Sequence, residues 1–185
     1  STYNHAGPVI VFVDRHNADD NLRDCGRLDA TNPCGGQPLS PYGCCCLGSI
    51  NLTVFVKDAF RTKARFDFAA FARVIHPAVR MLDNVLDVTV WPLAQQQAEA
   101  RAKRRIGLGV TGLADALILC KTRYGSPQSL DLIRTWLAAV SHAAYRASVE
   151  LAKEKGPFPL YDMNPYLSGA HIQALPPDIY NGIAA

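Results

Sequence analysis

The sequence predicts an α/β fold that becomes rich in helix in its second half. Two short apolar runs with β-branched residues, at 8–13 and 50–56, come first and predict strands. Stretches after residue 67 repeat apolar residues at spacings of three and four, which is typical of amphipathic helices. Because two strands alone would leave unpaired edges, this order favours a segment of a larger α/β domain over a complete fold.

The first half of the chain is expected to hold two strands separated by a long loop. Residues 8–13 are apolar and predict a buried strand. Residues 14–43 are dense in Asn, Asp, Gly and Pro, so they predict a loop. The second strand, at 50–56, is indicated by apolar residues at alternate positions: Leu52, Val54 and Val56.

The longest amphipathic helix is expected directly after Asp67, whose carboxylate is suited to capping a helix N-terminus. It ends before Trp91, and Pro77 inside it should kink it. Its apolar face would be formed by Phe68, Phe71, Ile75, Val79, Leu82 and Leu86.

Three further helices are predicted along the second half of the chain. Residues 94–105 are polar and basic and predict a short exposed helix, and 111–121 predict another. A third begins after the Ser126 cap, with Pro127 at its first position, and ends at Gly156. The tail from residue 158 is rich in proline and is expected to be irregular.

The composition is that of a globular protein with little net charge. The 185 residues carry a formal charge of +3, too small to predict binding to nucleic acid or to a membrane surface. No apolar run approaches the roughly 20 residues that a membrane span needs. Six cysteines without a basic-then-apolar leader favour reduced thiols in the cytoplasm over disulfides. Since the chain starts at Ser1 without Met, we expect a piece of a longer polypeptide.

Two cysteine motifs are the candidates for chemistry. Cys34 stands between Pro33 and Gly35-Gly36, a stiff loop with few side chains in which a thiol could meet a ligand. The alternative is a surface turn with an incidental cysteine. Residues 44–46 are three consecutive cysteines. A structural zinc site is not expected there, because the chain has no CxxC pairs.

Other patterns favour structural explanations. Residues 107–112 match G-x-G-x-x-G, but polar and basic residues precede them instead of a strand, so a loop packed closely on a helix start is expected. The basic cluster of Arg101, Lys103, Arg104 and Arg105 predicts a solvated helix face rather than a phosphate site. Asp83 and Asp87, four residues apart, should share a helix face.

The cysteine motifs resemble those of ribonucleotide reductases, most closely the adenosylcobalamin-dependent class II enzymes. The likeness lies in Asn32-Pro33-Cys34-Gly35, Gln37-Pro38-Leu39 and Cys45 with 47–52, and it continues through 80–85 and 104–113. It implies a ten-stranded α/β barrel with a finger loop at its centre. Residues 1–185 would be one incomplete segment of this catalytic domain, with the finger loop at about 30–46 and the helical part at about 67–156.

The resemblance implies a radical mechanism for reducing ribonucleotides. Cys34 would become a thiyl radical through adenosylcobalamin and abstract the ribose 3′-hydrogen. Cys45 would be one of two thiols that deliver reducing equivalents, restored by a thioredoxin-like dithiol; its partner would lie in the remainder of the reductase chain. Asn32 would form hydrogen bonds near the substrate hydroxyls or the catalytic carboxylate, while Gly35 and Gly36 would let the loop approach the sugar.

One departure from the family pattern keeps a second hypothesis open. The family places glutamate, the general base, where this chain has Gly36, and such a base typically contributes ~10²–10⁴-fold. The chain could therefore be a catalytically inactive remnant of the same fold. A weaker alternative is a thiol redox or metal-binding module that uses Cys44, Cys45 and Cys46.

Overall fold

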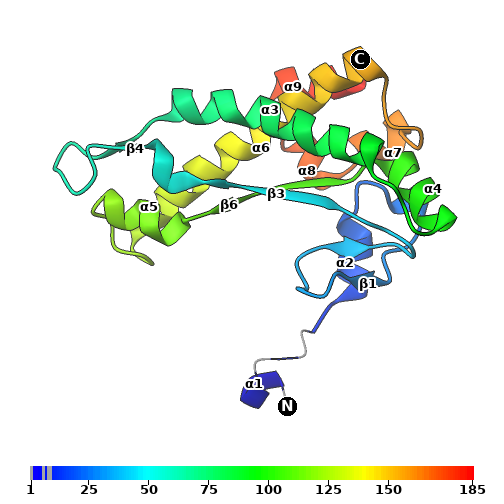
Figure 1. Ribbon diagram of the computed structural model, residues 1–185, viewed down its shortest axis with the longest axis horizontal. Coiled ribbons are helices and arrows are strands. Elements are labelled where there is room, and N and C mark those ends of the chain that lie inside the picture. Colours follow the sequence, from blue (N-terminus) through cyan, green and yellow to red (C-terminus); the bar gives the residue numbers. More distant parts are fainter. Residues whose placement is uncertain (1, 6, 8–9) are drawn as a thin grey trace. The chain divides into compact units, whose positions relative to one another are not determined.

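A computed structural model describes residues 2–5, 7 and 10–185 (Figure 1). The elements group into two compact units. The sheet unit consists of Cys46–Thr89 and Ile106–Pro157. The hairpin unit consists of Val90–Arg105, Phe158–Ala185 and the described part of Ser1–Cys45.

The sheet unit is built around a parallel pair of strands, β3 (Cys46–Asn51) and β6 (Ile106–Thr111), in the register Cys46↔Ile106 to Asn51↔Thr111. A second, antiparallel pair joins β4 (Val56–Lys57) to β5 (Arg65–Phe66). Among the described residues the strands form three two-stranded sheets, so this segment does not close a barrel by itself.

The strand predicted at 50–56 is wrong over its middle. Leu52–Phe55 form a 3₁₀ turn, η2, because the Asn51 carboxamide oxygen accepts the Thr53 amide at 3.0 Å and ends β3. Leu52 and Phe55, three residues apart, are both buried, whereas Val54 is 62% exposed. This spacing of buried residues is that of a helical turn rather than of a strand.

The glycine-rich stretch 107–112, predicted as a loop, lies in strand β6 up to Thr111. The prediction of close packing there is confirmed. A Cβ on Gly109 would lie 3.2 Å from the Ser49 hydroxyl oxygen on β3. Gly112, at φ +66°, follows the strand, and a Cβ on it would lie 2.7 Å from the Asn51 side-chain oxygen. These glycines therefore let neighbouring chain segments approach closely, and the G-x-G-x-x-G run does not follow a strand as a dinucleotide site requires.

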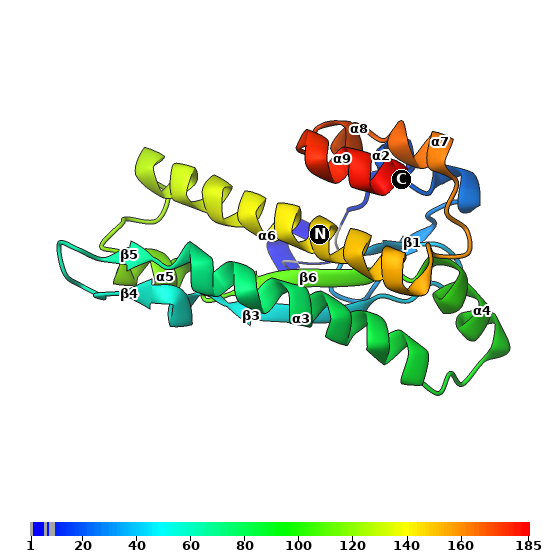
Figure 2. The same ribbon diagram turned by 90° about the horizontal axis from the view of Figure 1, so that it is seen from above.

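Two long helices lie side by side over the parallel strands (Figures 1 and 2). Helix α3 (Phe68–Val88) contacts both β3 and β6, and α6 (Pro127–Lys155) packs along α3 in the same direction. The predicted caps are confirmed: the Asp67 carboxylate accepts the Ala70 amide at 2.9 Å, and the Ser126 hydroxyl accepts the Ser129 amide at 3.2 Å. Helix α6 ends at Gly156, which has φ +84°.

The core of the sheet unit lies between these helices, the strands and α5 (Leu113–Leu119). The predicted face of α3 is confirmed except at Phe68, which is 41% exposed. Trp136 on α6 is fully buried, and its ring lies 4.8 Å from that of Phe66. On the same helix, Leu130 and Leu137 are 47% and 43% exposed.

Ion pairs join the ends of α3 and α6. The Lys155 ammonium contacts the Asp83 carboxylate at 2.6 Å and the Asp87 carboxylate at 3.0 Å, which confirms that these two acids share a helix face. Arg80 pairs with Glu154 one turn away. The hydrogen bond to Asp83 raises the pKa of Lys155.

The hairpin unit contains short elements. Helices α1 (Thr2–His5), α2 (Val13–Asp19) and a 3₁₀ turn, η1 (Arg23–Cys25), precede the strands β1 (Ala30–Thr31) and β2 (Pro38–Leu39). Helix α4 (Ala94–Lys103) follows, and the tail adds α7 (Met163–Leu167), α8 (Ala170–Gln173) and α9 (Pro177–Ala184). None of the described helices combines the length and hydrophobicity that crossing a membrane requires.

Several predictions are wrong in the hairpin unit. The stretch 14–43, predicted as a loop, contains most of α2 together with η1, β1 and β2. Pro8 and Val9 of the predicted strand lie outside the described residues, while 10–12 form no strand and Val13 begins α2. None of the strands in the described part of the chain pairs with this segment, and the apolar side chains of Ile10 and Phe12 are more than half exposed. The tail is helical rather than irregular, because its prolines stand at positions that helices tolerate, such as Pro177 at the start of α9.

Candidate active site

Cys34 lies in a turn that joins two short strands. β1 and β2 pair antiparallel in the register Ala30↔Leu39 and Thr31↔Pro38. Residues 32–37 connect them, and we call this segment the hairpin turn. It contains four of the five residues that the sequence analysis singled out, namely Asn32, Cys34, Gly35 and Gly36.

Asn32 closes the hairpin turn through both its backbone and its side chain. Its amide donates to the Gln37 carbonyl at 3.1 Å, and its side-chain oxygen accepts the Gln37 amide at 3.0 Å. Its carbonyl accepts the Gly35 amide at 2.9 Å, which makes residues 32–35 a β-turn. These three bonds give the turn a defined shape although no regular structure continues through it.

Cys34 occupies the third position of that β-turn and is exposed. Pro33 before it has the fixed φ that suits the second position, and Gly35 after it has φ +71°, which favours glycine. The thiol is therefore held by a constrained backbone and remains accessible to a reaction partner.

Gly36 has the space for a larger side chain. A Cβ built on it meets nothing within 4 Å, and its φ lies outside the left-handed region. A side chain at this position would therefore be tolerated without backbone strain. The hairpin turn itself carries no carboxylate in this chain, since Gln37 has an amide.

Cys45 lies outside the hairpin turn, in the segment between β2 and β3. It is half-buried, as are its neighbours Cys44 and Cys46. Burial raises the pKa of the Cys46 thiol, which keeps that group protonated at neutral pH. The described residues hold no group of three or more His, Cys, Asp and Glu side chains arranged to bind a metal ion.

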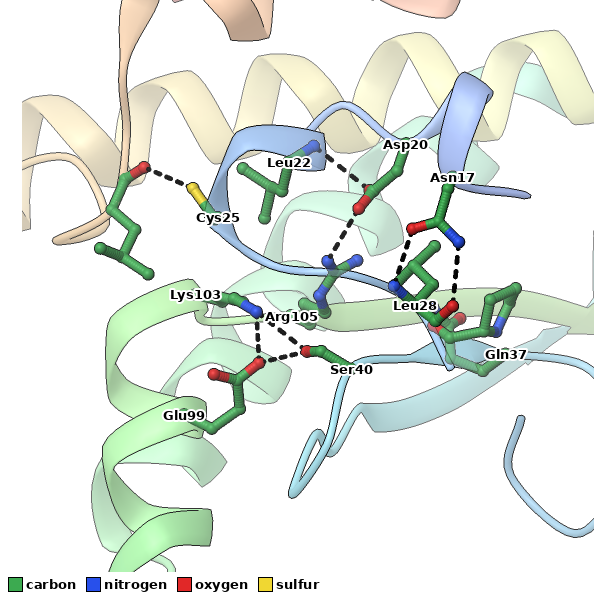
Figure 3. Close-up of polar contacts among 12 residues, drawn as sticks. Asn17, Asp20, Leu22, Cys25, Leu28, Gln37, Ser40, Glu99, Lys103 and Arg105 are labelled. Carbon is green, nitrogen blue, oxygen red and sulfur yellow. Dashed lines mark hydrogen bonds and ion pairs between the residues drawn. The ribbon is translucent and has the colours of Figure 1, made fainter. Parts of the chain in front are cut away.

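A polar cluster sits where β2 ends (Figure 3). The buried Ser40 hydroxyl donates to the Glu99 carboxylate at 2.5 Å, and the Lys103 ammonium donates to the Ser40 oxygen at 2.9 Å. Lys103 also pairs with Glu99 at 2.5 Å. Partial burial opposes ionisation of Glu99, but the hydrogen bonds from Lys103 and Ser40 outweigh it and lower the pKa of the carboxyl group. We call Ser40, Glu99 and Lys103 the anchor cluster.

The prediction of a solvated basic face on 94–105 is therefore wrong at two positions. Lys103 is only 6% exposed, and Arg105 is largely buried and pairs with Asp20 at 3.5 Å. Arg101 does face solvent. Both cations can be buried because each pairs with a carboxylate, Lys103 with Glu99 and Arg105 with Asp20. The i,i+4 spacing of Glu99 and Lys103 was a signal in the sequence for the first of these pairs.

A second set of bonds fixes the approach to β1. The Asn17 side chain donates to the Leu28 carbonyl at 2.9 Å and accepts the Leu28 amide at 2.8 Å (Figure 3). The Asp29 amide donates to the Leu39 carbonyl at 3.1 Å, beside the strand pair. Sequence reasoning missed Asn17 because its partner is backbone, which no residue type reveals.

The chain matches the protein family described as "Ribonucleotide reductase, barrel domain" over residues 1–180. It belongs to this family. The ribonucleotide reductase relatives include the vitamin B12-dependent ribonucleoside-diphosphate reductase of Mycobacterium tuberculosis, 42% identical over 85% of this chain and 22% of that protein. The similarly named protein of Thermoplasma acidophilum is 37% identical over 84% of this chain and 20% of its own length.

The relatives extend beyond the B12-dependent reductases. The ribonucleoside-diphosphate reductase large subunit of Vaccinia virus is 30% identical over 94% of this chain and 23% of its own length. The chain thus spans about a fifth of the length of the curated relatives it matches. The prediction of a mixed α/β segment of a ribonucleotide reductase barrel is confirmed, while family membership alone does not select one cofactor class.

Proposed function

We propose that the full-length protein containing this segment reduces ribonucleotides to deoxyribonucleotides for DNA synthesis, with Cys34 as the radical-bearing residue. The observation that carries the proposal is the exposed Cys34 thiol in a turn closed by three hydrogen bonds that involve Asn32, one donated and two accepted. Radical chemistry needs a thiol that is accessible to the substrate and held in a fixed place, since small misplacements of reacting groups are costly.

The proposed step at the ribose uses the Cys34 sulfur. As a thiyl radical it takes the 3′-hydrogen atom, so that an S–H bond forms, a C–H bond breaks and the unpaired electron moves to the sugar. The Asn32 side-chain oxygen is engaged by the Gln37 amide, and its NH₂ group is the donor that could reach a substrate hydroxyl. Gly35 and Gly36 would let the backbone of the turn approach the sugar.

The reducing equivalents would come from thiols. In the proposal Cys45 gives up electrons to the substrate and forms a disulfide with a cysteine elsewhere in the full-length protein. A thioredoxin-like dithiol then reduces that disulfide in the cytoplasm. The half-buried state of Cys45 fits a thiol that is reached by substrate rather than by bulk solvent.

Adenosylcobalamin is the cofactor that we propose. When bound, it supplies a radical through cleavage of its cobalt–carbon bond. The exposed Cys34 fits a radical that arrives from outside the hairpin turn, and we assign no residue of this segment to holding the cofactor. The higher identity to the two B12-dependent reductases than to the viral large subunit supports this choice.

A second candidate is a catalytically inactive remnant of the same fold. Gly36 favours it, because no titratable group stands at the position where the resemblance places the general base. Both candidates share the hairpin turn and differ only in whether turnover occurs.

The test is turnover by the full-length protein with a ribonucleoside diphosphate or triphosphate, a dithiol and adenosylcobalamin. We expect deoxyribonucleotide formation that stops when the cofactor is omitted. Turnover without cobalamin would overturn the proposed class II cofactor, but the proposed reductase activity would still stand. Absence of product under every condition would favour the inactive remnant.

A further inference from the structure

We propose that the anchor cluster of Ser40, Glu99 and Lys103 is a positioning site that sets the place of Cys34 by holding the second strand of the hairpin. The inference rests on the proposed function for its catalytic consequence. Its structural part, the ordering of the hairpin, stands independently of any turnover.

The cluster is directly connected to the hairpin. Ser40 follows Leu39, the last residue of β2, so a bond to its hydroxyl fixes the end of that strand. Both partners come from α4, a helix distant in sequence. Lys103 contributes two contacts, to Ser40 at 2.9 Å and to Glu99 at 2.5 Å, and Glu99 closes the triangle by accepting from Ser40.

Because the side chains of the anchor cluster are largely buried, the Lys103 ammonium needs both of its partners in place. The Lys103 side chain is 4% exposed and that of Glu99 is 20% exposed. A buried ammonium is costly unless its partners stay in place, so losing one partner is strongly unfavourable. A Cβ on Gly26 would lie 3.6 Å from the Lys103 nitrogen, an ordinary van der Waals distance. The ammonium therefore lies beside the segment that precedes β1.

The hairpin needs such support because it is small. Each strand has two residues, and an isolated two-stranded hairpin is at best marginally stable in water. Asn17 holds Leu28 ahead of β1, and the anchor cluster holds Ser40 behind β2. The hairpin turn with Cys34 lies between these two fixed ends, so its position depends on both.

The experiment compares the full-length wild-type protein with Lys103→Met, Lys103→Arg and a matched control, Lys155→Met. Lys155 also ends a helix and pairs with two carboxylates, but it belongs to the sheet unit. Two readouts are used: hydrogen exchange of the Asp29, Asn32 and Gln37 amides, and kcat and KM for ribonucleotide reduction.

In Lys103→Met we expect those hairpin amides to exchange about tenfold faster, the effect expected for the loss of one hydrogen bond to a charged group, while the β3 and β6 amides stay protected. A displacement of the thiol by about 1 Å would lower kcat by about 10²-fold, with a smaller change in KM. Lys103→Arg should recover part of the protection, and Lys155→Met should leave both readouts unchanged.

Unchanged exchange in Lys103→Met would overturn the inference, as would an equal loss of protection in Lys155→Met. If Lys103→Met does not fold, Ser40→Ala removes both hydrogen bonds of the Ser40 hydroxyl and keeps the Lys103–Glu99 pair, so the same exchange measurement on this variant tests the inference. If the wild-type protein shows no turnover, the proposed function fails, and the exchange data alone still support or refute the positioning site.

Discussion

Replacing Gly36 by glutamate tests how much of the reductase chemistry this hairpin turn retains. The substitution places a carboxylate two residues after Cys34, where the resemblance expects the general base. The structure accepts it, because a Cβ at Gly36 meets nothing within 4 Å and the backbone is not left-handed. We therefore expect a change in the free energy of unfolding within about 0.5 kcal/mol, as for an exposed surface position.

The expected effect on turnover is large. A positioned general base contributes ~10²–10⁴-fold, so Gly36→Glu should raise the rate of ribonucleotide reduction by that factor if only the base is missing. Gln37→Glu is the matched control, because it adds the same charge one residue further along the chain. It should give much less than the gain of Gly36→Glu.

The assay is deoxyribonucleotide formation by the full-length protein with adenosylcobalamin and a dithiol, together with denaturant unfolding to verify the fold. No gain from Gly36→Glu in a folded protein would refute the reasoning that Gly36 alone limits turnover. An equal gain from Gln37→Glu would show that charge rather than placement matters.

Three other residues carry further predictions. Asn32→Ala should speed hydrogen exchange of the Gln37 amide, while Asn32→Asp, which keeps the acceptor, should not; equal exchange in both variants would contradict the role of that bond. Trp136→Ala should lower the free energy of unfolding by about 3–5 kcal/mol, measured by denaturant titration with circular dichroism, and a loss below 1 kcal/mol would contradict its full burial. The pKa of Glu99 is lowered in the folded protein, so its contribution is present above the ordinary value of 4.5 and is lost as the pH falls through the lower folded value. Protection factors of hairpin amides should therefore be level from pH 7 to about 5 and fall at more acidic pH, and Glu99→Gln should flatten this profile.

Local signals in the sequence predicted the long helices well. Asp67 and Ser126 cap them as expected, and Gly156 ends the second one. These signals act within one turn of chain, so they can be seen without knowledge of the fold.

The strands depended on distant partners and were predicted poorly. β3 and β6 contain Gly48 and Gly109, which break the apolar alternation that indicates a strand. Their small size is needed because other groups approach closely, such as the Leu82 side chain 3.2 Å from a Cβ on Gly48. Only the fold shows these contacts between segments far apart in the sequence.

In the candidate site, too, the features that depend on neighbouring residues in the sequence were predictable, and those that depend on distant residues were not. The turn that holds Cys34 could be predicted from its proline and glycines, since the motif is continuous in sequence, and the thiol chemistry of Cys34 stays a prediction. The anchor cluster was not, because Lys103 in a basic run predicts exposure unless Ser40 is known to lie beside it.

The central claim, that Cys34 bears the radical, is tested most directly by deoxyribonucleotide formation in full-length Cys34→Ser. The matched control is Cys25→Ser, which changes a half-buried cysteine outside the hairpin turn. Both substitutions should be made in the wild-type and Gly36→Glu backgrounds. We predict that Cys34→Ser abolishes turnover and that Cys25→Ser keeps it. Turnover that persists in Cys34→Ser would contradict the account.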